Sequence, residues 1–162
     1  EQLESDYPNA FAYLNHYKEA LNNPKRDIKP TPETENEWHR YGRHQSLDKC
    51  DVPAKIIVGV LSQGNKYAID YYGTLISSGG TAGYCMITLP EDFSYSIYYI
   101  QALLNSKYLE WFSALNGEVF RGGYIARGTK VLKKLPIRII DFENETEKEL
   151  HDKIASLQKA LI

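Results

Sequence analysis

The basic residues between positions 107 and 138 are the ones whose types and spacing point to chemistry. Seven lysines and arginines lie there against two glutamates, Glu110 and Glu118, although the whole chain carries a formal net charge of −2. Cations aligned on one surface displace counterions from phosphates, so this segment is a candidate contact for a polyanion. The alternative is a solvated rim that only keeps the domain in solution. The seven residues are Lys107, Arg121, Arg127, Lys130, Lys133, Lys134 and Arg138.

The run Arg121-Gly122-Gly123-Tyr124 favours the polyanion contact slightly. Two glycines let a backbone approach a ligand closely, and here they lie between a guanidinium and an aromatic ring. By itself, this short motif is a weak indication.

A second candidate is the stretch Tyr41-Gly42-Arg43-His44-Gln45. Arginine can form two hydrogen bonds with guanine, and glutamine can form two with adenine. In an extended segment, residues two apart point to the same side, so Arg43 and Gln45 could reach one groove of a duplex. The alternative, which we favour, is that both belong to the scaffold. For the nearby Trp38, a role as a core or loop anchor is favoured over a functional ring.

Motifs for catalysis and for metal or cofactor binding are missing from the sequence. His16, His39, His44 and His151 have no metal-ligand spacing, and neither a glycine-rich cofactor loop nor a phosphate-binding loop occurs. The sequence Asn/Asp-Pro-Pro-Tyr/Phe does not occur either. We therefore expect this chain to bind a partner rather than to catalyse a reaction, and we assign it no metal and no cofactor of its own.

The surrounding pattern predicts an α+β fold. We expect helices over residues 8–21, 94–116 and 146–161, and strands over residues 55–61, 66–72, 84–89 and 119–125. The first two strands should pair as an antiparallel hairpin through the turn at residues 62–65. Together the strands should form a twisted, mainly antiparallel sheet or a partly open barrel flanked by helices, with a spacer-like helix at the C-terminus.

Two details of the predicted helices bear on function. In the long central helix, one apolar face is expected to be buried, and Asn105-Ser106 favours a break because both residue types prefer caps. That face consists of Ile97, Ile100, Leu104, Tyr108, Trp111 and Leu115. In the last helix, Thr146 and Glu149 fit a capping box. Leu150, Ile154, Leu157 and Leu161 then recur at heptad spacing, which fits either a partner helix or packing on the same domain.

Composition sets the context. The length fits one domain without a metal or disulfide staple, and Cys50 and Cys85 are too few for a disulfide framework. Neither a signal peptide nor a membrane span is evident, so we expect a cytoplasmic protein with free thiols. Because the sequence begins at Glu1 and contains only one methionine, Met86, we expect it to be a piece of a longer protein.

Several short motifs, taken in order, are similar to a known family and cover most of the chain. They are Tyr7-Pro8-Asn9; Trp38; Tyr41-Gly42-Arg43 with Gln45; Lys55-Ile56-Ile57-Val58; Asp70 with Gly73; Gly79-Gly80; Leu103-Leu104-Asn105-Ser106-Lys107; Arg121-Gly122-Gly123-Tyr124; and Leu135-Pro136-Ile137. The arrangement resembles the C-terminal target-recognition domain of TaqI-like adenine-specific DNA methyltransferases and of type IIG restriction-modification enzymes. The final helix also resembles the spacer helices of type I specificity subunits.

The resemblance implies a domain that reads a short double-stranded DNA sequence and positions it for a methyltransferase domain of the same chain. That domain would use S-adenosylmethionine and flip an adenine from the stack, with or without a fused endonuclease. No membrane partner is implied. The base sequence that is read cannot be carried over, because Cys50-Asp51-Val52-Pro53 and Gly64-Asn65 lie where such regions vary.

On this basis we predict a linker helix over residues 1–22, a target-recognition domain over residues 23–142 and a spacer-like helix over residues 143–162. The alternative function is a helix-mediated protein-interaction module that makes no direct contact with DNA and docks a partner through residues 150–161. Steeply salt-dependent binding to duplex DNA would distinguish the two. The expected DNA contacts are Arg40, Arg43, Gln45, Lys66, Arg121, Tyr124, Arg127 and Lys130.

Overall fold

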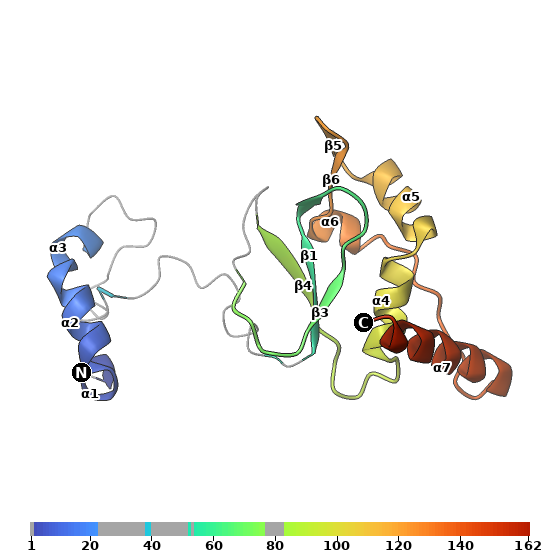
Figure 1. Cartoon of the computed structure of the whole chain (residues 1–162), viewed down its shortest axis with the longest axis horizontal. Helices are drawn as coiled ribbons and strands as arrows, with labels where there is room; N and C mark the ends of the chain where they lie inside the picture. The colour runs from blue at the N-terminus through green and yellow to red at the C-terminus, as the bar shows by residue number, and fades with distance from the viewer. Residues whose placement is uncertain (1, 23–37, 40–51, 53, 77–82) are drawn as a thin grey trace. The chain divides into compact units, whose positions relative to one another are not determined.

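The chain forms two compact units, Glu1–His44 and Gln45–Ile162 (Figure 1). The structure is a computed structural model, and it describes residues 2–22, 38–39, 52, 54–76 and 83–162.

The N-terminal unit contains three short helices, α1 (Gln2–Asp6), α2 (Pro8–His16) and α3 (Lys18–Leu21). Pro8 occupies the first turn of α2, where its missing N–H is not needed. At Tyr17 the backbone leaves the helical conformation, with φ −104° and ψ 13°, so the single helix predicted over residues 8–21 is interrupted there. The sequence pattern also gave no indication of α1.

Trp38 anchors the N-terminal unit. Its ring is 5% exposed and lies 6.4 Å from the ring of Phe11, measured between centroids, while the Lys18 ammonium lies 5.4 Å from the indole. Cation–π contact and apolar burial both stabilise this arrangement. The interpretation of Trp38 as an anchor is therefore confirmed.

The first sheet of the second unit contains β1 (Lys55–Gly59), β3 (Ala68–Asp70) and β4 (Tyr84–Ile87), in the order β3-β1-β4. Both pairings are antiparallel, and Lys55 lies opposite Asp70. The predicted pairing between the first two strands is thus confirmed, as is a strand within residues 84–89. The α+β class is confirmed as well.

The described strands form two sheets rather than one, however, and they do not close into a barrel. A second antiparallel sheet contains β2 (Leu61–Ser62), β5 (Val119–Phe120) and β6 (Tyr124–Ala126), in the order β2-β6-β5. The chain changes sheets at Val60, whose N–H donates to the Gly83 carbonyl at 2.9 Å and whose carbonyl accepts from the Arg127 N–H at 2.6 Å. Because β2 is only two residues long, no alternating pattern could mark it.

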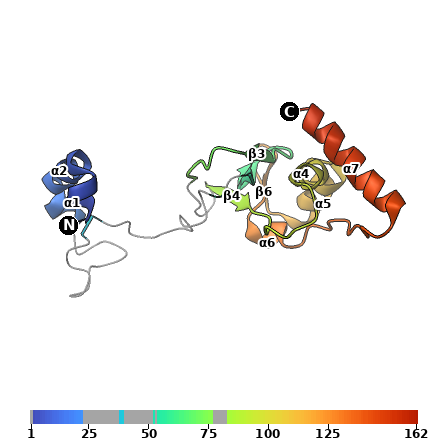
Figure 2. The same ribbon diagram turned by 90° about the horizontal axis from the view of Figure 1, so that it is seen from below.

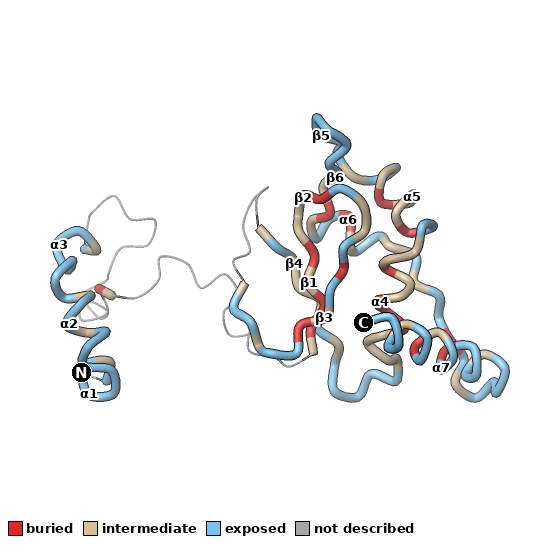
Figure 3. Tube along the Cα trace, in the orientation of Figure 1, coloured by how far each residue is buried: buried red, intermediate tan, exposed pale blue. Residues whose placement is uncertain are grey.

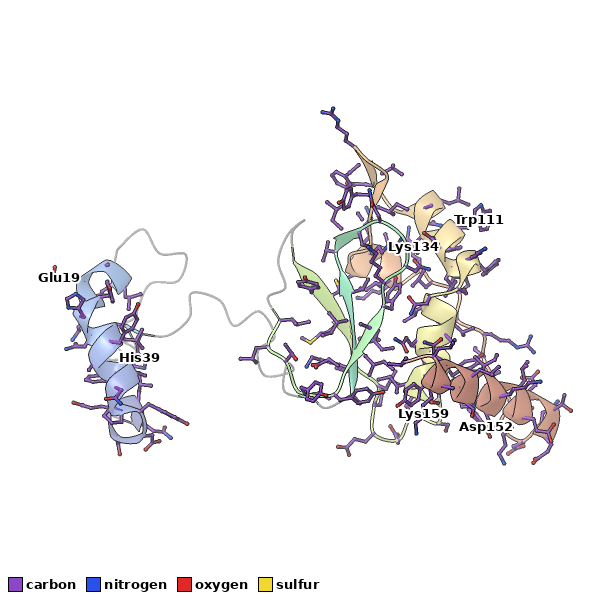
Figure 4. The ribbon with its side chains drawn as sticks, viewed as in Figure 1. Glu19, His39, Trp111, Lys134, Asp152 and Lys159 are labelled. Carbon is purple, nitrogen blue, oxygen red and sulfur yellow. The ribbon has the colours of Figure 1, made fainter. Side chains whose placement is uncertain are left out.

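The central helix is broken as predicted, into α4 (Ile97–Leu104) and α5 (Lys107–Asn116). The Ser106 hydroxyl caps α5 by accepting from the Leu109 N–H, and the Asn105 side chain bonds both the N–H and the carbonyl of Tyr67. The break turns α5 away from the line of α4, so the expected buried face does not continue along it. Leu109 and Ser113 are buried instead, and Tyr108, Trp111 and Leu115 are exposed. Figure 4 shows Trp111 pointing away from the sheets.

The core lies around α4, which contacts β1 and β3 on one side and α7 (Glu145–Ala160) on the other (Figure 2). Figure 3 shows buried positions on β1, α4 and α7, with others on β2, α5 and α6. The buried apolar cluster consists of Ile56, Val58, Tyr67, Tyr99, Ile100, Leu104, Leu109, Ile140 and Ala155.

The last helix begins one residue earlier than its expected first residue, Thr146. Asn144 caps it, because its side-chain oxygen accepts from the N–H groups of Thr146 and Glu147. The expected capping box at Thr146 and Glu149 is therefore wrong. On the side that faces α4, His151 is buried, and its Nε2 accepts from the Ser96 N–H at 3.0 Å.

Candidate nucleic-acid interface

The predicted strand over residues 119–125 is in fact a tight hairpin, β5–β6. Val119 pairs with Ile125 and Phe120 with Tyr124, so residues 121–123 form the turn. Gly122 and Gly123 have φ values of +84° and +77°, in a backbone region that residues with a side chain rarely adopt. The two glycines thus serve to reverse the chain, and they place Arg121, which is exposed, at the tip.

Tyr124 lies against this turn. A Cβ at Gly122 would meet the Tyr124 ring at 3.6 Å, so the ring packs over the glycine backbone, and it remains 40% exposed. A second loop reaches the tip, since the Gln63 amide donates to the Gly122 carbonyl at 2.6 Å. The structure therefore brings Arg121 and Tyr124 together with the loop at residues 62–66.

Arg127 does not share this surface. Its side chain is 0% exposed, its Nε donates to the Ser62 hydroxyl at 2.9 Å, and its Nη1 donates to the side-chain oxygen Oδ1 of Asn65 at 2.6 Å. Burial raises the pKa of the neighbouring Tyr67 hydroxyl, and the guanidinium opposes that rise. A buried guanidinium offers a phosphate no surface, so the expected DNA contact at Arg127 is corrected to a structural role.

Lys66 is exposed and follows the same loop. Its surroundings are not purely basic, because the Glu110 carboxylate on α5 lies against Gly64, 3.4 Å from where a Cβ would stand. An acidic group beside the loop weakens phosphate attraction there relative to the hairpin tip.

Lys130 lies on α6 (Thr129–Leu132) and is exposed, as are Lys133 and Lys134, which follow it. Figure 4 labels Lys134 beside α6. Arg138 is different, because its Nη2 lies 3.2 Å from Glu147 at the start of α7. Of the seven basic residues in the segment, Arg127 and Arg138 are thus engaged within the chain, while Lys107, Arg121, Lys130, Lys133 and Lys134 are exposed.

A groove of about 550 Å³ runs beside β4 and α6. Its walls are mainly apolar, with Lys133 at its edge and Ile100 and Leu104 of α4 contributing. None of the described residues expected to contact DNA lines it. Arg40, Arg43 and Gln45 lie outside the described residues.

A buried ion pair holds the turn after β3. The Lys55 ammonium lies 2.7 Å from the Asp70 carboxylate, which also accepts from the N–H groups of Tyr72 and Thr74 and from the Thr74 hydroxyl. The hydrogen bond from Lys55 is the main cause that holds the pKa of Asp70 well below its usual range, against the opposing effect of burial. Asp70 therefore has a structural role in the turn.

Sequence reasoning missed the polar residues that support the interface, namely Ser62, Gln63 and Asn65. Their partners lie about forty to sixty-five residues away along the chain, so no local pattern could identify them. The described parts of the chain contain no cluster of His, Cys, Asp or Glu able to hold a metal ion. Within those parts, no helix combines the length and apolar character of a membrane span.

Comparison with known proteins decides the family. Residues 6–137 match the family described as the TaqI-like C-terminal specificity domain. The chain belongs to this family. It is also 54% identical over 161 residues to the type II restriction enzyme and methyltransferase RM.Eco57I of Escherichia coli. That match covers 99% of this chain and 16% of the relative, so the chain spans about a sixth of its length. The resemblance seen in the sequence is confirmed, and α7 lies beyond the range that matches the family.

Proposed function

We propose that this chain recognises a short sequence in double-stranded DNA as the specificity domain of a restriction-modification enzyme. The observation that carries the proposal is membership of the specificity-domain family, together with a hairpin that presents an arginine and a tyrosine at a tip supported by a second loop. A relative that is named as both restriction enzyme and methyltransferase supports the same function.

The described residues that we propose to contact DNA are Arg121, Tyr124, Lys66 and Lys130. Arg121 and Lys130 suit phosphates, because both are exposed cations, one at the hairpin tip and the other on α6. Arg40, Arg43 and Gln45 remain proposals from the sequence. The loop at residues 62–66 and the hairpin tip at residues 121–123 lie side by side, so they are the described segments best placed to reach base edges.

The rest of the longer protein would supply the chemistry. We propose that it contains a methyltransferase domain, that S-adenosylmethionine supplies the methyl group there, and that no residue of this chain holds the cofactor. In that protein, residues 1–22 would link to the preceding part, residues 23–142 would read DNA and residues 143–162 would act as a spacer. The expected setting is the cytoplasm, where the DNA substrate is found.

Salt dependence of DNA binding tests the proposal. The parent chain should bind duplex DNA, and log Kd should rise linearly with log salt concentration, by about 0.9 for each phosphate contacted. Replacing Arg121 and Lys130 by alanine together should lower that slope by up to about two. Fluorescence anisotropy with a labelled duplex, selected from a randomised pool, provides both quantities.

Lys153→Ala is the control, and its effect on the slope is compared per positive charge removed, because the double variant loses two charges and the control loses one. Lys153 is exposed on α7, which lies apart from the hairpin in both ribbon views, so its loss should leave the slope unchanged (Figures 1 and 2). An equal decrease for Lys153→Ala would show only a general charge effect. No binding to any duplex by the folded parent chain would refute the proposed function.

Protein contact through α7 is a second candidate function, favoured by one observation. On α7, Ile154 packs against the core, but Leu150, Leu157 and Leu161 are 42%, 59% and 83% exposed. Exposed leucines at heptad spacing are typical of a helix that meets another helix. We propose that this stripe contacts the rest of the longer protein. Leu157→Lys in the full-length enzyme should then make the connection between its domains more sensitive to protease. The same substitution in the isolated chain should leave DNA binding unchanged.

A further inference from the structure

Arg127 carries a buried positive charge that no carboxylate balances among the described residues. It follows directly after β6, and its two hydrogen bonds reach back to Ser62, at the end of β2, and to Asn65, within the loop between β2 and β3. Its Nη2 makes no hydrogen bond within the described structure. Burying a charge without a counterion lowers the stability of a fold, so stability alone does not account for an arginine at this position.

Asn65 extends this contact to the helices. While its side-chain oxygen accepts from Arg127, its Nδ2 donates to the carbonyls of Leu104 at 2.7 Å and Ser106 at 3.1 Å. Those carbonyls lie at the break between α4 and α5. The arginine and the asparagine therefore join three parts of the fold, namely the end of β6, the loop at residues 62–66 and the helix break.

The same loop is tied directly to the hairpin tip by Gln63, which donates to Gly122 at 2.6 Å. The loop that carries Lys66 and the hairpin that carries Arg121 and Tyr124 are thus joined twice, once at the surface by Gln63 and once inside by Arg127. Directional hydrogen bonds fix a relative position more narrowly than apolar contact does, because apolar contact has no preferred angle.

We propose that Arg127 is a positioning residue for DNA recognition, which holds the loop at residues 62–66 and the hairpin tip in one geometry so that they act as a single reading surface. This proposal rests on the DNA-binding function proposed above. The planar guanidinium supplies two donors at a fixed angle to Ser62 and Asn65, whereas a lysine supplies the same charge without that fork. Charge and geometry can therefore be separated by substitution.

Arg127→Lys and Arg127→Met test the proposal in two assays. In amide hydrogen exchange without DNA, both variants should exchange faster than the parent at residues 62–66 and at residues 121–123 together. In binding, Kd for the duplex selected by the parent should rise about tenfold or more, since hydrogen bonds to a charged group are lost. Kd for a scrambled duplex and the salt slope of Arg127→Lys should stay at the parental values.

Gln63→Ala serves as the matched variant if the buried substitutions prevent folding, which circular dichroism would show. It removes only the surface tie, so it should fold, loosen the same two segments and weaken binding to the selected duplex without changing the salt slope. A parental exchange pattern in folded Arg127→Lys or in Gln63→Ala would overturn the proposal. So would parental affinity of Arg127→Lys for the selected duplex, which would assign the role to charge alone.

A salt slope reduced by about one in Arg127→Met, which removes the charge, would also overturn it, because that result marks a direct phosphate contact. Failure of the parent chain to bind any duplex refutes the DNA-binding function instead. In that case the exchange data still decide whether Arg127 couples the two segments.

Discussion

Gly117 is the position where a single methyl group should displace the hairpin. It ends α5 and leads into β5, and a Cβ there would lie 2.6 Å from the Ala126 carbonyl oxygen, 2.8 Å from the Ile125 Cγ2 and 2.9 Å from the Ser113 carbonyl oxygen. Two of these atoms belong to the backbone and cannot rotate away. With φ −92° and ψ 158°, the glycine has ordinary extended geometry, so the effect of alanine would be steric rather than conformational.

The size of the effect follows from the contacts. Overpacking that forces backbone to shift costs about 1 to 3 kcal/mol, and for a unit of this size that lowers Tm by about 4 to 12 °C. Because two of the three obstructing atoms belong to β6 and the third belongs to α5, the adjustment should move the hairpin away from α5. Gly117→Ala should therefore also weaken DNA binding, although residue 117 carries no side chain that could contact DNA.

Two other glycines provide controls in the same thermal unfolding assay. Among the described residues, a Cβ at Gly59 would meet only the Leu61 carbonyl oxygen, at 3.6 Å, so Gly59→Ala should leave Tm unchanged or raise it slightly. At Gly123 no described atom lies within 4 Å of a Cβ, but φ is +77°, so Gly123→Ala should lower the free energy of unfolding by about 1 kcal/mol through the backbone alone. A parental Tm for Gly117→Ala would refute the packing of the hairpin against α5.

Three further predictions concern stability. Below about pH 4 the Gln45–Ile162 unit should lose stability, because the depressed pKa keeps Asp70 ionised in the fold while the unfolded chain takes up a proton. Asp70→Asn should be less stable than the parent at neutral pH. Urea unfolding should show the difference in free energy of unfolding between the two proteins becoming smaller as the pH falls. Trp38→Ala should lower the Tm of the N-terminal unit, since losing a buried tryptophan lowers the free energy of unfolding by about 3 kcal/mol or more. Loss of DNA binding at an unchanged Tm would instead show that the ring has a functional role. Ser106→Ala should lower the free energy of unfolding by about 1 kcal/mol, and Ser106→Gly by only a few tenths of a kcal/mol, because Ser106 caps α5. Equal Tm values for the two variants would argue against this cap.

Local signals in the sequence predicted the elements whose causes are local. The break at Asn105-Ser106 is one example, because a serine before a helical run can cap it wherever the helix lies. The pairing of β1 with β3 is another, since two β-rich runs with a short connection favour an antiparallel hairpin. In both cases the evidence lies within about fifteen residues.

The failures share a different cause. Tyr108, Trp111 and Leu115 continue the apolar period of α4, but the direction of α5 after the break depends on Asn65 and Tyr67, which lie some forty residues earlier. Arg127 has the composition of a DNA contact, and only its distant partners Ser62 and Asn65 show that it is buried. Periodicity identifies a face, while tertiary hydrogen bonds decide whether that face is covered.

These hydrogen bonds form a continuous path that crosses the unit. Gln158 on α7 donates to the side chain of Gln101 on α4, and Gln101 donates to the Tyr67 carbonyl. The Asn105 side chain, at the helix break, accepts from the Tyr67 N–H. Asn65 then connects the break to Arg127, because it donates to the Leu104 carbonyl and accepts from the guanidinium. Apolar packing alone would let α4 slide against the sheets at little cost, whereas each of these bonds is lost by a shift of about 1 Å. Because buried polar groups left without partners are expensive, the whole path favours one register of α4. The position of the hairpin tip is therefore set from inside the fold, and a change as distant as Gln101→Leu should alter the exchange rates at residues 121–123, whereas an exposed change such as Lys153→Ala should not.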